Sequence, residues 1–185
     1  IDEVGEKLKS ALGYKPIGIL IPMHNSASTL HRALSSIAMQ SIIDKIKVYC
    51  VDDSSENAEN DKENEIINSF KNYIDIEYCG QVAFSCVGKA RNYLLDFCTK
   101  CEYIYFLDAD DMLYTTYALE PLYNLIRADI RYTVIEGNFY EETYINNGQK
   151  QLIPHGSNPV FIHAKLYRYD FLRNNNIRFS ETQYN

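Results

Sequence analysis

Three carboxylates, Asp108, Asp110 and Asp111, stand within four residues directly after the apolar run Tyr103–Leu107. Such a run, rich in aromatic residues, is typical of a strand buried on both faces of a parallel sheet, so the acids fall at its carboxyl end. Like charges this close raise one another's pKa values unless a cation or hydrogen-bond donors compensate them. Carboxylate oxygens suit Mg²⁺ or Mn²⁺, which bind one or two carboxylates together with substrate phosphates. The spacing indicates a divalent metal site, and a solvated acidic turn is the alternative.

Two more predicted strands end in polar residues that could line the same site. Pro22 ends the first strand and is followed by His24 and Asn25, and the second strand runs into Asp52 and Asp53. Because the carboxyl ends of parallel strands meet at one edge of a sheet, we expect all three turns to converge on one crevice. Each turn taken alone also has a structural explanation, since His24 could be an ordinary turn residue and the aspartates could cap a helix.

The chain lacks the glycine-rich patterns that bind phosphates through backbone N–H groups. Neither G-x-G-x-x-G after the first strand nor G-x-x-x-x-G-K-[ST] occurs in the sequence. A diphosphate at this edge would therefore need a metal ion, which stabilises the charge that develops when a nucleoside diphosphate departs.

The order of the predicted elements is that of an α/β protein. Strands alternate with helices, which predicts right-handed crossovers and a mainly parallel sheet with helices on both faces, a Rossmann-like three-layer domain. A short amphipathic lead-in helix in residues 1–15 precedes this domain, which we expect to occupy residues 16–185. The strands are predicted at 17–22, 46–51, 74–79 and 103–107, and the helices between them at 28–41, 59–72 and 88–100.

The last part of the chain predicts two helices and a hairpin. Residues 115–129 have a helical pattern in which Pro121 marks either the true start or a kink. Residues 132–139 and 151–153 read as strands joined by a turn at Asn146, Asn147 and Gly148, an Asn-Gly hairpin signal. Residues 164–174 predict a basic, aromatic helix.

The composition describes a single globular domain: 185 residues, 46% of them hydrophobic, can bury a sizeable core. The formal net charge of −7 argues against a nucleic-acid partner. No run approaches ~18 apolar residues and no signal peptide is recognisable, so we expect no transmembrane segment and a cytoplasmic location, with any membrane attachment made through parts outside this chain. The odd number of cysteines fits reduced thiols, and Cys98 and Cys101, despite their redox spacing, predict a structural role.

The sequence resembles the family 2 glycosyltransferases of the GT-A fold over roughly residues 16–181. Five short pieces match in the family's order, and that order makes the resemblance specific although each piece is brief. The pieces are IGILIPMHNSASTLHRALSSIAMQS (17–41), KVYCVDDSSEN (47–57), GKARNYLL (88–95), YFLDADDML (105–113) and KLYRYDFLRNNNIRFSE (165–181).

The resemblance implies a nucleotide site and a metal site. The family's first turn contacts the base, a carboxylate matched by Asp53 accepts from the uracil ring, and the arginine of the A-R-N piece contacts the nucleotide. The D-x-D element holds ribose and the metal-bound diphosphate. The implied nucleotide-binding residues are Pro22, His24, Asn25, Asp52, Asp53, Arg91 and Asp108, and the implied ligands of Mg²⁺ or Mn²⁺ are Asp110, Asp108 and Asp111.

The activity implied by the resemblance is inverting transfer of a sugar from a UDP-sugar to a hydroxyl of a glycan, a lipid-linked acceptor or a cell-surface polymer, as in polysaccharide biosynthesis. The sequence departs from the family at Ser54, where the turn usually has glycine. The family's general base is an aspartate in an acidic pair beyond the piece that ends at Glu181. We therefore expect that base beyond Asn185, a domain cut short at its C-terminus, and donor binding with little or no transfer by this chain.

Two other classes of protein share some of these features. An aspartyl-nucleophile phosphatase or phosphotransferase also carries D-x-D at a strand end, but it needs Thr or Val where this chain has Met112. A receiver-like domain would bind Mg²⁺ through Asp52, Asp53 and a further aspartate, and it needs a lysine after the fifth strand, where Phe139 and Tyr140 stand instead. Both remain alternatives on the sequence alone.

Overall fold

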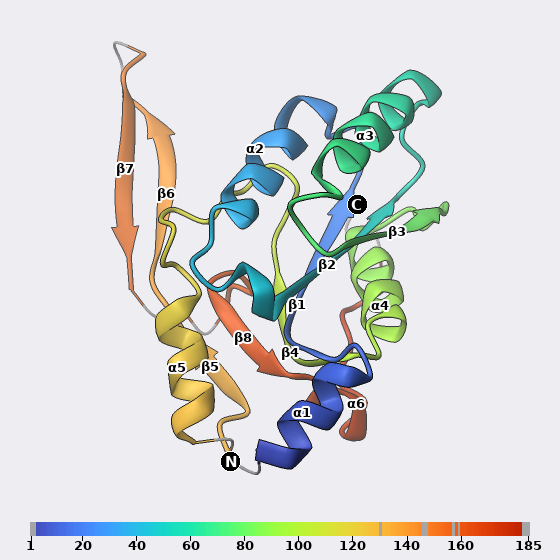
Figure 1. Cartoon of the computed structure of the whole chain (residues 1–185). Helices are drawn as coiled ribbons and strands as arrows, with labels where there is room; N and C mark the ends of the chain where they lie inside the picture. Colours follow the sequence, from blue (N-terminus) through green and yellow to red (C-terminus); the bar gives the residue numbers. More distant parts are fainter. Residues whose placement is uncertain (1–2, 130, 146–147, 157, 159, 183–185) are drawn as a thin grey trace.

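A six-stranded sheet forms the centre of the computed structural model, which describes residues 3–129, 131–145, 148–156, 158 and 160–182 (Figure 1). The strand order is β3-β2-β1-β4-β8-β5, in which the first four strands are parallel and β8 runs antiparallel to both of its neighbours. The strands are β1 (Lys15–Met23), β2 (Ile46–Asp52), β3 (Ile76–Gln81), β4 (Cys101–Phe106), β5 (Val134–Glu136) and β8 (Lys165–Arg168).

Helices cover both faces of the sheet because the side chains of its central strands are buried alternately on each side. Ile19 and Ile21 of β1 pack on one face with α2, α3 and α5, whereas Leu20 packs on the other face with α4 and α6. The predicted three-layer α/β architecture is confirmed. The helices are α1 (Glu3–Ala11), α2 (Ala27–Ala38), α3 (Asn57–Phe70), α4 (Val87–Phe97), α5 (Glu120–Ala128) and α6 (Tyr169–Asn174), with a 3-10 turn at Ile43–Lys45.

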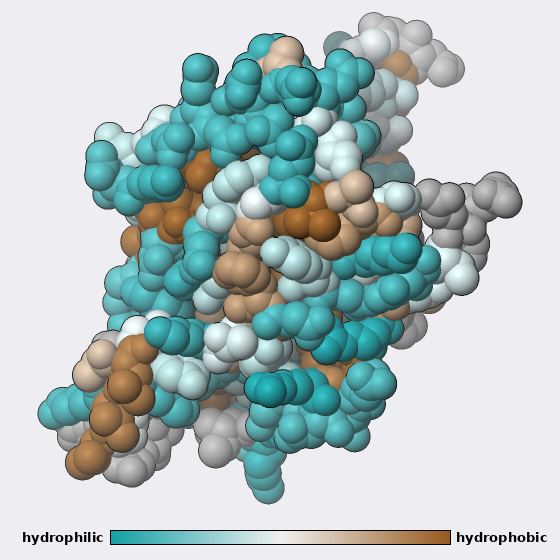
Figure 2. Space-filling view, turned by 90° about the vertical axis from the view of Figure 1, so that its right-hand side faces the viewer, coloured by the Kyte–Doolittle hydropathy of each residue, from teal (hydrophilic) through white to brown (hydrophobic). Residues whose placement is uncertain are grey.

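The outer surface of the helical layers is mostly polar. Figure 2 shows the face over α3 and α4, where hydrophilic residues predominate and apolar residues are visible between them. Helix α1 precedes β1 in the chain, and an ion pair between Lys9 of α1 and Glu102 of β4 connects it to the sheet. Among the described residues, no helix combines the length and the apolar character that crossing a bilayer requires.

The segment 165–174 corrects the sequence prediction, which made 164–174 one helix. Lys165–Arg168 is instead strand β8, and only Tyr169–Asn174 is helical. Leu166 is fully buried and lies opposite Tyr105 of β4 and Ile135 of β5. The open hydrogen-bonding edges of β4 and β5 are satisfied by a strand inserted between them, so tertiary pairing outweighs the local helical pattern.

The predicted strand 132–139 is also wrong as a single element. Val134–Glu136 is β5 of the main sheet, and a separate two-stranded hairpin is formed by β6 (Phe139–Tyr144) and β7 (Lys150–His155). The chain changes sheets at Gly137, whose N–H donates to the carbonyl of Ala164 at 2.7 Å. Of the predicted turn, Asn146 and Asn147 lie outside the described residues. Pro121 falls in the first turn of α5 and so marks the true start of that helix.

Cys98 and Cys101 lie where α4 gives way to β4, and both are buried free thiols. A hydrogen bond with Cys101, together with burial, raises the pKa of the Cys98 thiol. A Cβ atom added at Gly18 would lie 2.8 Å from Sγ of Cys98 and 2.9 Å from Sγ of Cys101. The two sulfurs therefore fill the space that glycine leaves beside β1.

Candidate functional site

The turns after β1 and β2 are joined by hydrogen bonds into one surface. The backbone N–H of Asp53 donates to the carbonyl of Met23 at 2.8 Å, and Nδ1 of His24 lies 2.6 Å from the carbonyl oxygen of Asp53. The N–H of Asn25 donates to Oγ of Ser55 at 2.8 Å. The convergence expected from parallel strand ends is therefore present for these two turns.

Asp52 and Asp53 have different environments although they are adjacent. Asp52 is fully buried, and its carboxylate accepts from N–H and Oγ of Ser55 and from Nδ2 of Asn60 at 2.5–2.9 Å. These three bonds are all made within the chain, so Asp52 holds the turn in shape, and its predicted contact with the nucleotide stays a prediction.

Asp53 is half-buried and supports the loop that follows β3. Its Oδ1 accepts from the N–H groups of Phe84 and Ser85 at 2.7 and 3.2 Å. Its Oδ2 accepts no hydrogen bond from the residues that the structure describes. Asp53 can therefore offer one carboxylate oxygen to a ligand while the other keeps the 82–86 loop in place.

The acidic turn after β4 is held from two helices. Arg91 of α4 donates from Nη2 to both carboxylate oxygens of Asp108, at 2.6 and 2.9 Å, and Arg32 of α2 donates to the carbonyl oxygen of Asp110. Oγ of Ser36, also on α2, accepts from the N–H of Leu113 at 3.0 Å. Asp110 and Asp111 remain exposed residues.

The electrostatics of this turn match the crowding expected from its sequence. Desolvation of its carboxyl group, followed by repulsion from Asp108 and Asp110, raises the pKa of Asp111, and His163 and Arg32 oppose that rise. Within the described ranges, no three His, Cys, Asp or Glu side chains are arranged as a ready metal site. Asp110 and Asp111 offer carboxylate oxygens, which are ligands that Mg²⁺ and Mn²⁺ prefer, and their role in binding a metal stays a prediction.

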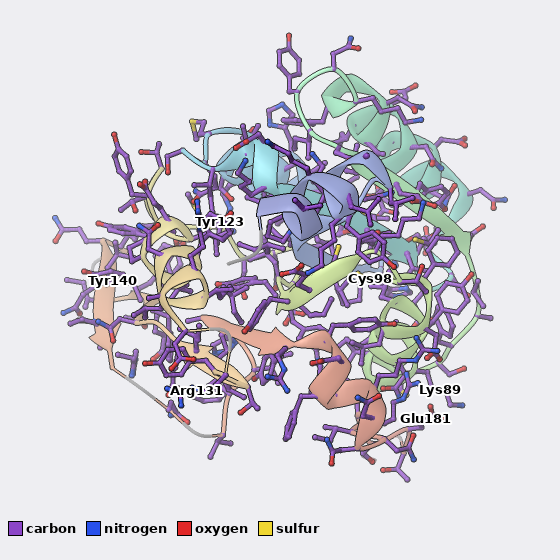
Figure 3. All side chains as sticks on the ribbon, turned by 60° about the horizontal axis from the view of Figure 1, so that its bottom comes forward. Lys89, Cys98, Tyr123, Arg131, Tyr140 and Glu181 are labelled. Atoms are coloured by element: carbon purple, nitrogen blue, oxygen red, sulfur yellow. The ribbon has the colours of Figure 1, made fainter. Side chains whose placement is uncertain are left out.

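A segment near the C-terminus packs against α4 beside this turn, and the sequence analysis missed it. The side-chain amide of Asn92 bonds both backbone groups of Phe179 at 3.0–3.1 Å and the carboxylate of Glu181 at 2.9 Å. The ring of Phe179 lies 5.4 Å from the guanidinium carbon of Arg91. Figure 3 shows Glu181 close to Lys89 of α4, at the opposite side of the molecule from Tyr140. The only indication of this packing in the sequence is Asn92, which directly follows Arg91 in the A-R-N piece.

Comparison with known proteins identifies the family. A family model for glycosyl transferase family 2 matches residues 18–183. The chain belongs to glycosyl transferase family 2. For this chain the family's transferase activity is a proposal, and neither alternative class has support from the comparisons.

This chain is similar to proteins of which it spans half or less. It is 34% identical over 118 residues to poly(ribitol-phosphate) beta-N-acetylglucosaminyltransferase TarP of Staphylococcus aureus (strain N315), which covers 60% of this chain and 32% of TarP. The solved structure of S. aureus TarS 1–349 in complex with UDP has a TM-score of 0.71 at 21% identity, covering 90% of this chain and 50% of that one. The mannosyltransferase PcManGT from Pyrobaculum calidifontis, in complex with GDP-Man and Mn²⁺, has a TM-score of 0.68 at 16% identity, covering 91% and 48%.

These likenesses confirm the predicted fold and family and leave the finer assignments open. The chain spans half or less of each of these proteins. The predicted nucleotide contacts Pro22, His24, Asn25 and Arg91 and the predicted metal ligands stay predictions, to which the geometry adds the ion pair of Arg91 with Asp108.

Proposed function

We propose that this glycosyltransferase transfers a sugar, with inversion, from a UDP-sugar bound across the ends of β1, β2 and β4 to a hydroxyl of a glycan. The observation that carries the proposal is the joining of the ends of β1 and β2, at the edge of the sheet where β4 also ends: His24 and Asn25 are hydrogen-bonded to the turn that presents Asp53. UDP in the TarS complex supports a uridine nucleotide, and the polymer named in TarP supports a polymeric acceptor.

In this proposal each end of the donor is bound by its own group of residues. Oδ2 of Asp53 accepts from the uracil ring N–H, with His24 and Asn25 beside the base. Asp108, held by Arg91, faces the ribose. The ion pair orients the carboxylate, because the side chain of Arg91 is only 14% exposed and its guanidinium is always protonated.

Asp110 and Asp111 would hold Mg²⁺ or Mn²⁺, as the Mn²⁺ in the PcManGT complex suggests for a protein of this fold. Bound there, the ion would neutralise the charge that develops on the departing diphosphate. Arg32 fixes the backbone of Asp110 from α2 and so orients the carboxylate. The general base is not assigned to any residue between 3 and 182, so the test of the proposal is donor binding.

Titration calorimetry with UDP in the presence of Mn²⁺ tests this proposal. We expect binding by the wild-type chain, and a loss of at least tenfold in affinity for Asp110→Ala, because a metal-bound diphosphate loses a ligand. Asp61→Ala on the exposed side of α3 removes the same charge elsewhere and is the matched control. Absence of UDP binding, or equal affinities for the Asp110 and Asp61 variants, would contradict the proposal.

A further inference from the structure

Four aromatic rings form a cluster outside the two hydrophobic cores, and we name them the ring cluster: Phe139, His155, Phe161 and His163. Phe139 stacks on His155 with ring centroids 4.8 Å apart, and Phe161 stacks on His163 at 5.0 Å. Phe139 meets the other pair edge-on, at 5.9 Å from Phe161 and 4.9 Å from His163. The cluster joins the base of the hairpin to the loop that enters β8.

The loop that carries half of this cluster is held by a buried ion pair. Lys165, with its side chain 7% exposed, pairs with Glu136 at 3.1 Å and also donates to the carbonyl oxygens of Asn158 and Phe161. Glu136 accepts from the N–H of Asn158 at 2.7 Å. Burial of the Lys165 charge costs desolvation energy, which the ion pair and the two carbonyl contacts offset, and these contacts position Phe161 and the residues beside it.

The backbone next to the ring cluster is strained as well. Ala164 has φ of 59°, in the left-handed region that residues with a Cβ avoid, and its carbonyl accepts from Gly137 at 2.7 Å. Such strain persists only where the surroundings enforce it and gathers at ligand sites. Together with the ion pair of Lys165, it holds the backbone on both sides of His163 in place.

The ring cluster borders the acidic turn on the side away from Asp53. In the sheet, β4 lies between β1 and β8, so the turn after β4 has β2 and Asp53 on one side and the start of β8 on the other. Leu166 of β8 is paired with Tyr105 of β4 in antiparallel register, so His163, three residues before Leu166, lies at the end of β8 that adjoins the acidic turn. The rings of Tyr114 and Tyr140 lie 4.5 Å apart and connect the loop after the acidic turn to the hairpin, which stands beside α5 in Figure 1.

The chemistry of the ring cluster suits an uncharged sugar ring. Phe161 is 44% exposed, and an aromatic face attracts the C–H groups of a pyranose because it carries partial negative charge. Neither ring nitrogen of His163 has a hydrogen-bond partner in the part of the chain that the structure describes, so both are free to bond hydroxyl groups. A few such polar groups on an apolar floor are typical of small-ligand sites.

The charges around the ring cluster disfavour a phosphate polymer. Lys165, at the start of β8, is paired with Glu136 at 3.1 Å. Glu141 adds a negative charge beside His155, 3.0 Å away, and the chain as a whole carries −7. An anionic acceptor would meet repulsion here, whereas a neutral glycan would not.

We infer that the ring cluster binds the sugar ring of the acceptor, an uncharged glycan, beside the diphosphate of the donor. This inference rests on the proposed function, and it divides the site: nucleotide on the β2 side of the acidic turn, acceptor sugar on the β8 side. Lys165 is a positioning residue for this subsite, because it fixes the carbonyl of Phe161 without facing the ligand.

Nuclear magnetic resonance with simple acceptor mimics tests the inference. The chain, saturated with UDP and Mg²⁺, is titrated with methyl β-D-glucopyranoside and methyl N-acetyl-β-D-glucosaminide. We expect one of the two to shift the ring signals of His163 and Phe161. In Phe161→Ala its affinity should fall at least fivefold and in Phe161→Leu less, while the affinity for UDP changes by less than twofold. Tyr73→Ala removes a ring that is 71% exposed in the turn after α3, and it should change neither the affinity for the glycoside nor the affinity for UDP.

Four outcomes would overturn the inference, and they are distinguishable. Absence of glycoside shifts while UDP binds removes the acceptor subsite and leaves the proposed function standing. Shifts caused by ribitol 5-phosphate and not by the glycosides would assign the cluster to a charged polymer. If Phe161→Ala weakens UDP-N-acetylglucosamine but not UDP, the ring bound here is the donor's own sugar. Failure of UDP to bind the wild-type chain would instead reject the proposed function, and the acceptor role with it.

Discussion

Gly88 in the first turn of α4 permits the closest backbone contact between the C-terminal segment and the site, and Gly88→Ala should break it. A Cβ atom there would lie 2.0 Å from the carbonyl oxygen of Ser180, so that oxygen must retreat by about 1.4 Å to reach ordinary contact. Backbone cannot rotate away as a side chain can. The segment that includes Phe179 must move as a unit or α4 must shift.

The cost of Gly88→Ala follows from the contacts that this movement breaks. Asn92 makes three hydrogen bonds to Phe179 and Glu181, each with a net value of about 0.5–1.5 kcal/mol. The edge-on pair of Phe106 and Phe179, with centroids 5.0 Å apart, adds about 0.5–1.5 kcal/mol. Alanine favours a helix over glycine by about 1 kcal/mol, which offsets part of the loss. If all of these contacts are lost, we expect a net destabilisation of about 1–5 kcal/mol.

Urea unfolding of Gly88→Ala beside Gly156→Ala measures this effect. Gly156 has no atom within 4 Å of an added Cβ, so its variant carries the same chemical change without the contact. Amide hydrogen exchange should also show lost protection at Phe179, whose N–H is bonded to Asn92 at 3.0 Å. Equal midpoints for the two variants, with unchanged exchange at Phe179, would refute the argument that α4 and the segment are in direct backbone contact.

Three further substitutions test other parts of the structure. Gly18→Ala should cost about 1–3 kcal/mol by overpacking against the sulfurs of Cys98 and Cys101, and a urea double-mutant cycle should show a smaller cost when both cysteines are alanine; an equal cost in both backgrounds would count against that packing. Asp52→Asn should lower stability by about 1–3 kcal/mol, because an amide turns a donor toward groups that already donate; an unchanged urea midpoint would show that the carboxylate is not needed. Asp111→Asn should raise the urea midpoint at pH 7: the folded-state pKa of Asp111 is raised, so its charge destabilises the fold above that pKa and the gain should vanish as pH falls below the unfolded value, whereas a gain that persists at low pH would contradict this origin.

The sheet and the position of its site could be predicted from sequence because each signal there is local. Apolar runs such as Tyr103–Leu107 cannot be anything but buried, and the acids that follow must then stand at the strand's carboxyl end. The parallel order of the strands brings the turns at Asp53 and Asp108 to one edge without any knowledge of side-chain contacts. The register of the strands and the hydrogen bonds between those turns could not be predicted from the sequence, because they depend on contacts between residues far apart in the chain.

The errors of prediction lie where distant parts of the chain decide the local structure. Leu166 belongs to a strand because β4 and β5 offer it partners, and four residues carry too little pattern to reveal that. Asp52 and Asp53 are identical in type, and only the positions of Ser55 and Asn60 make one of them buried and the other available. The ring cluster, too, is assembled from residues up to 24 apart, between Phe139 and His163.

The central claim is that Asp53 and Asp110 bind opposite ends of one nucleotide, and separate titrations with uridine and with Mn²⁺-pyrophosphate test it most directly. Asp53→Asn keeps the oxygen that accepts from Phe84 but removes the carboxylate charge. It should therefore lower the affinity for uridine and leave the affinity for Mn²⁺-pyrophosphate unchanged. Asp110→Ala should weaken pyrophosphate and spare uridine. If each variant weakens both ligands equally, or neither ligand is affected by either change, the two carboxylates do not share a donor and the account is wrong.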